Sequence, residues 1–160
     1  MEHIQDILIE AREELKRLEH IIYVSLKYTR TVDVIINAVK RLVNIYDLMI
    51  EALLEKAKME DKIDVLAKSP ALRATKLAEI YEDDAQLQKY LSFYAFLKTV
   101  LKLPYTKREE FRRHVTLVVE LKNCTAEIDI DNLTNCEKFS HEFLVYADEL
   151  VNGKKEEDEF

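Results

Sequence analysis

The side chains best suited to chemistry gather in one segment of this 160-residue chain, YTKREEFRRHVTL, residues 105–117. An imidazole can exchange protons, while guanidinium and ammonium groups bind phosphate oxygens. Because phosphates attract cations and bases stack on aromatic rings, the segment could bind RNA or another polyanion. The predicted polyanion-binding residues are Lys107, Arg108, Arg112 and Arg113, within a wider set that adds Lys98, Lys102, Tyr94, Tyr105 and Phe111.

The same segment also has a structural interpretation, which the sequence favours. Here Tyr94 and Phe111 belong to the core, and the cations face acidic side chains across a hairpin, namely Glu120, Glu127 or Asp129. The residues before the hairpin would form a short helix with surface pairs at i,i+4, Glu109 with Arg113 and Glu110 with His114. In this interpretation the cluster is an ordinary surface.

The spacing of Arg108 and His114, with five residues between them, resembles the Arg/His motif of HEPN-type ribonucleases. Proteins of that family are small helical bundles that dimerise and cleave RNA without a metal ion. The resemblance implies that His114 handles protons and Arg108 steadies phosphate charge. Six residues along a straight helix turn by about 240° and rise by about 9 Å, so the pair would have to meet across a dimer. The sequence also departs from the family, because His114 leads directly into a strand.

A second resemblance rests on two segments, KYTRTVDVI (residues 27–35) and YTKREEFRRHVTL. Both are similar to segments of a small archaeal family of helical proteins without an assigned function. The resemblance implies a cytoplasmic, heat-adapted helical protein and adds no activity.

Polar residues around the first of these segments could also be functional. A solvated helix side is predicted to carry Arg30, Asp33, Asn37, Lys40, Arg41 and Asn44. The alternative is that residues 28–33, at a helix junction, form an anion-binding helix N-terminus.

Three carboxylates, Glu127, Asp129 and Asp131, share one face of a predicted strand. Such oxygens suit Mg²⁺ or Ca²⁺, but this spacing without a glycine-bearing loop matches no known metal motif. We therefore expect no metal and no cofactor, and we assign Asp131 to the turn before the last helix. The two cysteines, Cys124 and Cys136, are predicted to be reduced, partly buried thiols.

Composition limits the possible partners. The net charge of −7 argues against a protein whose whole surface binds nucleic acid or an anionic membrane. No apolar run approaches the roughly 18 residues of a membrane span, and the acidic, amphipathic N-terminus does not resemble a signal peptide. A cytoplasmic location is expected. The high content of Glu, Lys and Arg also fits a heat-adapted protein.

The elements that must position these residues are mainly helical, because the chain has one Gly and two Pro. Apolar stripes in residues 2–58 predict a long antiparallel pair of helices that separates near Lys27–Arg30, with Thr31 as N-cap. One continuous bent helix is the alternative. A loop over 59–68 follows, then a helix from Ser69–Pro70 to about Tyr81.

Further helices are predicted from Asp83–Asp84 to about Leu103 and, from a capping box of Thr106 and Glu109, over residues 107–113. Alternating apolar residues then predict a β-hairpin at about 115–130, before a last helix at about 134–152. The fold class is mainly α, a helical bundle forming one domain over 1–152, with a disordered charged tail at 153–160.

The leading functional prediction is a non-enzymatic helical interaction protein that forms a homodimer through its N-terminal helices and binds an unknown protein partner. The alternative is a HEPN-like RNA-binding or RNA-cleaving protein acting through Arg108 and His114. A small-molecule enzyme has little support, since we find no nucleophile with a base, no phosphate loop and no cofactor fingerprint.

Overall fold

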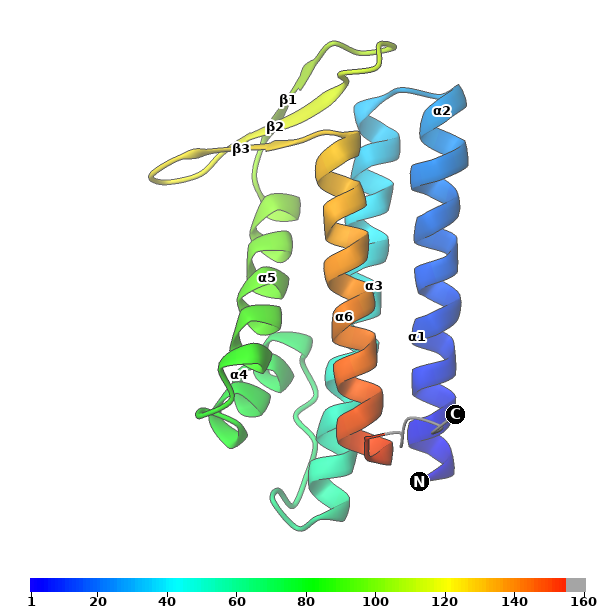
Figure 1. Ribbon diagram of the computed structural model, residues 1–160. Helices are drawn as coiled ribbons and strands as arrows, with labels where there is room; N and C mark the ends of the chain where they lie inside the picture. Colours follow the sequence, from blue (N-terminus) through cyan, green and yellow to red (C-terminus); the bar gives the residue numbers. More distant parts are fainter. Residues whose placement is uncertain (155–160) are drawn as a thin grey trace.

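The computed structural model describes residues 1–154, which form a bundle of long helices with a small sheet across one end (Figure 1). This is the mainly α fold class that the sequence predicted. The predicted tail lies outside the described residues from residue 155 onward. The elements are α1 (Glu2–His20), η1 (Ile21–Ser25), α2 (Leu26–Tyr28), α3 (Val32–Met59), α4 (Pro70–Ile80), α5 (Ala85–Lys102), β1 (Tyr105–Arg108), β2 (Thr116–Glu120), β3 (Thr125–Ile128) and α6 (Ile130–Asn152).

The predicted antiparallel helix pair is confirmed. A short turn separates α2 from α3, and the Thr31 hydroxyl caps α3 by accepting from the Val34 amide at 3.4 Å. α3 then runs back along α1 and is also packed against α4, α5 and α6. Arg41, predicted on the solvated side of α3, instead donates to both carboxylate oxygens of the buried Glu14 on α1, at 3.0 Å each.

Between α1 and α2 the helix widens into a single π-helical segment, η1. If the apolar stripe of α1 continued in steps of three and four residues, it would next fall on the polar residues Ser25 and Thr29. The wider turn carries the buried face from Ile22 to Leu26 instead, and both side chains are buried. The helix formed by α1, η1 and α2 therefore continues for another turn before the junction with α3.

The caps of the two middle helices were predicted correctly. The Ser69 hydroxyl accepts from the Leu72 amide at 3.1 Å, with Pro70 in the first position of α4. Asp84 accepts from the Leu87 amide at 3.1 Å and begins α5. Residues 60–69 between α3 and α4 form the expected loop.

The sheet has three antiparallel strands in the order β1-β2-β3. The predicted hairpin is confirmed as β2 and β3, with Leu117 opposite Ile128. The helix predicted over 107–113 is wrong, because Tyr105–Arg108 pairs with β2 as a third strand. The loop that follows holds Glu109 and Phe111 at φ of 53° and 68°, a left-handed backbone that a right-handed helix excludes.

The last helix, α6, begins at Ile130, four residues earlier than predicted. Asp129 accepts from the Asn132 amide at 2.8 Å, and the Asn132 side chain accepts from the Asp129 amide at 3.1 Å. This reciprocal capping box uses Asn where the usual signature has Glu or Gln, so the sequence pattern did not reveal it.

An aromatic cluster fills the space between α3, α5 and α6. The ring of Phe143 stacks on Tyr90 at 4.5 Å between centroids and lies 5.1 Å from Tyr46. Ser140 donates to the Tyr46 hydroxyl at 3.1 Å, which satisfies polar atoms inside the core. Across the residues that the structure describes, no helix is long and apolar enough to cross a membrane.

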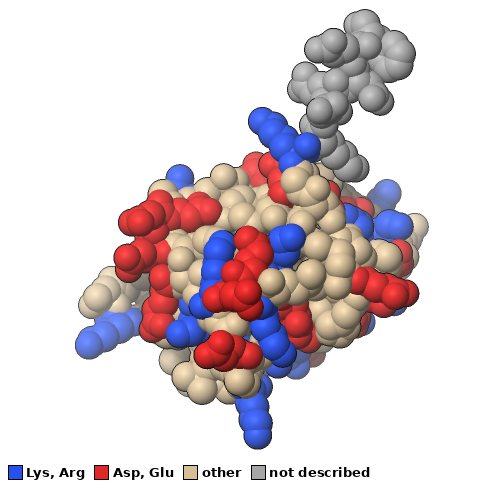
Figure 2. Space-filling model, turned by 90° about the horizontal axis from the view of Figure 1, so that it is seen from below, with Lys and Arg blue, Asp and Glu red and all other residues tan. Residues whose placement is uncertain are grey.

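The end of the bundle opposite the sheet carries the start of α1 and the end of α6 (Figure 1). Figure 2 looks onto this end and shows Lys and Arg side chains interleaved with Asp and Glu side chains. Because both signs alternate on this face, it forms no patch of a single charge.

Candidate functional site

The two segments singled out in the sequence meet at the sheet end of the bundle. The Phe111 amide donates to the Arg30 carbonyl at 2.7 Å, and the Val32 amide donates to the Glu110 carboxylate at 3.2 Å. Glu110 therefore occupies the N-terminus of α3, where a helix favours negative charge. The loop after β1 and the junction before α3 form one cross-linked unit, although about 80 residues of chain separate them.

A pocket of about 250 Å³ opens beside this unit, between η1 and α2 on one side and the start of α6 on the other. Ile22 and Leu26 supply apolar lining, and Tyr23 also contributes. We call it the sheet-end pocket. Its charged and titratable lining residues are Lys27, Arg30, Arg113, His114, Asp129 and Asp131.

Three cations line the pocket together with two carboxylates, Asp129 and Asp131. Among the described residues, Lys27, Arg30 and Arg113 form no ion pair within 4.0 Å. The Arg30 Nε atom is buried and has no hydrogen-bond partner in that same part of the chain. Asp129 lines the pocket but already accepts the Asn132 amide at the start of α6. A guanidinium in this position is suited to binding an anion.

Arg108 and His114 have separate surroundings. Arg108 lies on β1, opposite Thr116, and donates to Glu127 on β3 at 2.8 Å. This contact raises the pKa of Arg108 and lowers the pKa of Glu127. His114 lines the sheet-end pocket, which Arg108 does not line. No hydrogen bond joins the two side chains within the described chain.

The predicted polyanion-binding residues likewise divide. Lys107 lies 3.5 Å from Glu110 and 3.9 Å from Asp33, while Arg108 pairs with Glu127. Arg112 and Arg113 form no ion pair among residues 1–154, and of the four predicted residues only Arg113 lines the pocket.

The structural interpretation of the segment is correct in part. Tyr94 is buried, with the Lys98 ammonium 5.3 Å from its ring centroid, and Arg108 does face Glu127 across the sheet. Phe111 was assigned to the core but is 78% exposed. The predicted pairs of Glu109 with Arg113 and Glu110 with His114 are absent from this described segment, because it is not helical.

The sequence did not reveal the full lining of the pocket. Arg30 was noted at the helix junction and Arg113 in the basic segment, but nothing in the sequence joined them. Lys27 belongs to a segment that the sequence singled out, but not as a cation of a site, and Tyr23 carried no signal, because their place in the pocket depends on η1 and on the early start of α6.

A metal site is not supported by the acidic strand face. Asp129 is the N-cap of α6, and Glu127 is engaged by Arg108. Within residues 1–154 no group of three or more His, Cys, Asp or Glu side chains could hold a metal ion.

A second candidate surface is a groove of about 410 Å³ between α1 and α6. Leu15, Leu144 and Val145 line it, and Val145 is 45% exposed. We call it the α1/α6 groove. Its charged and titratable rim consists of Arg12, Lys16 and Glu19 on α1 and of His141, Asp148 and Glu149 on α6.

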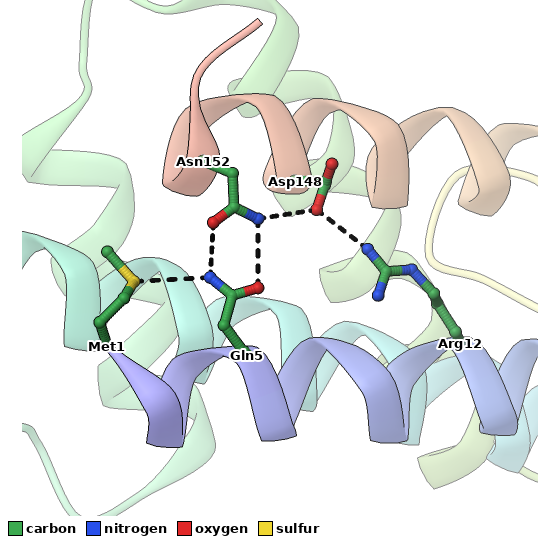
Figure 3. A network of polar contacts seen from close by, with 5 residues as sticks. All are labelled: Met1, Gln5, Arg12, Asp148 and Asn152. Carbon is green, nitrogen blue, oxygen red and sulfur yellow. Dashed lines mark hydrogen bonds and ion pairs between the residues drawn. The ribbon is translucent and has the colours of Figure 1, made fainter. Parts of the chain in front are cut away.

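Polar contacts at one end of the α1/α6 groove fix the two helices in register (Figure 3). Arg12 pairs with Asp148 at 2.9 Å, and Asn152 donates to Asp148 at 2.9 Å. The side-chain amides of Gln5 and Asn152 donate to each other. At this end of the groove, these contacts fix the position of α1 along α6.

Comparison with family models, with curated proteins and with solved structures gave no match. The resemblances to a small archaeal family and to HEPN-type ribonucleases remain predictions.

Proposed function

We propose that this chain is a non-enzymatic helical interaction protein that forms a homodimer through the α1/α6 groove. The apolar stripes of the N-terminal helices, which the sequence predicted as the interface, are buried inside the chain and are not available for it. The observation that carries the proposal is the distribution of charge along the groove. The α1 wall carries Arg12 and Lys16 before Glu19, whereas the α6 wall carries Asp148 and Glu149 after His141. Apolar side chains lie between these walls.

At one end of the groove the charges on the two walls are opposite in sign and lie at the same level. Arg12 lies level with Asp148, because the two form an ion pair. Further along, Glu19 lies beside Glu137, whose pKa it raises, one turn from His141. A twofold axis parallel to the helices would set each α1 wall over the partner's α6 wall at the same level. At the level of Arg12 and Asp148 opposite charges then face each other across the interface, and the exposed Val145 side chains become covered.

The molecular mass in solution tests this proposal. Light scattering should give twice the chain mass of 18.9 kDa at micromolar concentration. Val145→Glu places a charge in the apolar groove and should raise the dimer dissociation constant at least about tenfold. Leu72→Glu is the matched control, because Leu72 is a 60% exposed apolar residue on α4. A monomer at high micromolar concentration contradicts the proposal.

A second candidate function is HEPN-like RNA binding or cleavage, which the presence of His114 in a cation-lined pocket favours. Since Arg108 and His114 are not joined within one chain, this function needs the two residues to meet across copies. It predicts RNA cleavage in EDTA that Arg108→Ala and His114→Ala both abolish while each variant keeps its helical circular dichroism. Intact RNA in the presence of the unmodified protein contradicts it.

The proposal includes a cytoplasmic location and heat adaptation. What supports the location is that Cys124 and Cys136 are free thiols, the state that a reducing compartment maintains. What supports heat adaptation is the network in which Glu14 binds both Arg17 and Arg41.

A further inference from the structure

We infer that the sheet-end pocket is a binding site for a phosphate monoester, held by Arg30 and Arg113 with Lys27 beside them. This inference goes beyond the homodimer and does not depend on it. The pocket differs from the set of basic residues that the sequence suggested, since Lys107, Arg108 and Arg112 do not line it.

The first step is that the cations of the pocket lack acceptors within the described part of the chain. Arg30 has a buried Nε atom without an acceptor among the described residues, and burying a charged donor in this way is costly. Arg113 and Lys27 enter the same pocket, also without an ion pair in that part of the chain. A phosphate offers several acceptor oxygens and binds guanidinium groups in a bidentate manner. It would supply the missing partner.

The second step concerns the two loops that carry Arg30 and Arg113, which hydrogen bonds hold together. The Phe111 amide is bonded to the Arg30 carbonyl at 2.7 Å, and Glu110 is bonded to the Val32 amide. Arg30 and Arg113 therefore sit on two loops that are tied together. On the loop that carries Arg113, Glu109 and Phe111 hold a left-handed backbone, which persists only where the surrounding contacts fix it. A backbone that is fixed before binding loses little entropy on binding.

The third step decides between a terminal phosphate and an extended polyanion. Asp129 and Asp131 line the same pocket and repel any phosphate, so the cations leave room for one phosphate and the pocket offers no second anion position beside it. A terminal phosphate carries about −1.5 to −2 charges, so it gains more from three convergent cations than a singly charged phosphodiester does. Carboxylate oxygens can in addition accept from sugar hydroxyls. The ligand class is therefore a phosphorylated sugar, either free, as in a nucleoside monophosphate, or at the 5′ end of an RNA.

Titration calorimetry on the full chain tests the site with four probes: AMP, adenosine, and one oligoribonucleotide with either a 5′-phosphate or a 5′-hydroxyl. We expect binding by AMP, by the 5′-phosphorylated strand or by both, and none by the two unphosphorylated probes. Binding of AMP alone identifies a free nucleotide as the ligand, and binding of the phosphorylated strand alone identifies an RNA end.

Neighbouring arginines provide a matched pair of variants. Arg113→Gln should weaken binding at least about tenfold, because it removes charged hydrogen bonds to the phosphate. Arg112→Gln removes the same charge one residue away, outside the pocket, and should change affinity by less than about threefold. Arg30→Gln should behave like Arg113→Gln, and the exposed Arg113 carries the test if the Arg30 variant fails to fold.

Three results would overturn the inference. They are the failure of both phosphorylated probes to bind, equal binding of the 5′-phosphate and 5′-hydroxyl strands, and equal losses in Arg112→Gln and Arg113→Gln. Dimer formation is read separately, from the molecular mass, so either proposal can fail without the other.

Discussion

At the scale of single residues, the two cysteines differ sharply in their surroundings. Cys124 is exposed in the turn between β2 and β3, whereas Cys136 is half-buried on α6. Burial raises the pKa of the Cys136 thiol to about 11. Because the thiolate is the reactive form, the two side chains should differ in chemical reactivity.

We predict that iodoacetamide at about pH 8 modifies Cys124 and leaves Cys136 unmodified in the folded protein. Only about one Cys136 side chain in a thousand would be ionised at that pH. Intact mass spectrometry should show one adduct in buffer and two in denaturant. Cys124→Ser should show no rapid adduct, and two adducts forming at equal rates in buffer would contradict the assignment.

Glu137 on α6 is another residue with unusual surroundings, being only 8% exposed. Burial, and then the neighbouring Glu19 carboxylate, raise the pKa of Glu137, while His141 and Lys138 act in the opposite direction. The folded state thus keeps this proton to a higher pH than the unfolded chain does. The free energy of unfolding therefore rises as pH falls from the raised pKa toward the ordinary value of 4.5.

We predict that Glu137→Gln is more stable than the unmodified chain at pH 7, because a neutral amide avoids the cost of the buried charge. The stability difference should shrink as the pH approaches 4.5, and urea unfolding at several pH values measures it. Glu142→Gln, an exposed position on the same helix, is the control. A stability difference that does not vary with pH would show that Glu137 is not the titrating group.

At the scale of elements, Asp84 joins two helices. One carboxylate oxygen accepts the Leu87 amide and caps α5, and the other accepts the Tyr146 hydroxyl of α6. The Asp84 carboxylate thus fixes the start of α5 against the aromatic cluster.

We predict that Asp84→Ala lowers the free energy of unfolding by about 2–3 kcal/mol, the sum of a helix cap and a hydrogen bond to a charged group. Asp83→Ala, at the adjacent exposed position, should cost less than about 0.5 kcal/mol. Urea denaturation of both variants checks this, and equal losses would show that the contacts of Asp84 add nothing specific.

The sequence predicted those elements whose pattern is local. The stripes of α1 and α3 and the caps at Thr31, Ser69 and Asp84 depend on residues within a few turns of each other. β1 was missed because all four of its residues are exposed, so they show no alternation of apolar and polar side chains. Its strand structure comes from pairing with β2, and Thr106 and Glu109 only resemble a capping box.

The candidate site was less predictable than the fold. Arg30 and Arg113 lie in separate segments, and the bonds between Phe111 and Arg30 and between Glu110 and Val32 are what bring those segments together. No periodicity records contacts over such a sequence distance. The sequence could therefore name basic residues, but it could not say which of them share a pocket.

At the scale of the whole molecule, the chain combines scarce backbone breakers with charged pairs between helices. It has one Gly and two Pro, and ion pairs join α1 to α3 and α1 to α6. Such networks contribute more at high temperature, because the hydration of charges becomes less favourable there.

We predict a thermal midpoint above about 65 °C, the upper end of the range for domains from moderate-temperature organisms. Differential scanning calorimetry at low and at about 1 M salt measures it. Salt should lower the midpoint, since it screens partly exposed pairs. A midpoint near 50 °C would contradict heat adaptation.

The proposed dimer would also determine how the ligand sites are presented. A twofold axis parallel to the helices keeps both sheets at the same end of the assembly. The two sheet-end pockets would then face the same direction, so that one ligand with two phosphorylated ends could occupy both.

The π-helical segment η1 has a consequence for how this chain can change in length. Loss of one residue within Ile21–Ser25 would restore ordinary α-helical winding and leave the flanking apolar positions facing α3. The same deletion near Leu15 would rotate everything beyond it by about 100° and expose Leu18. Insertions and deletions among relatives of this chain are therefore expected at this turn rather than elsewhere in its first helix.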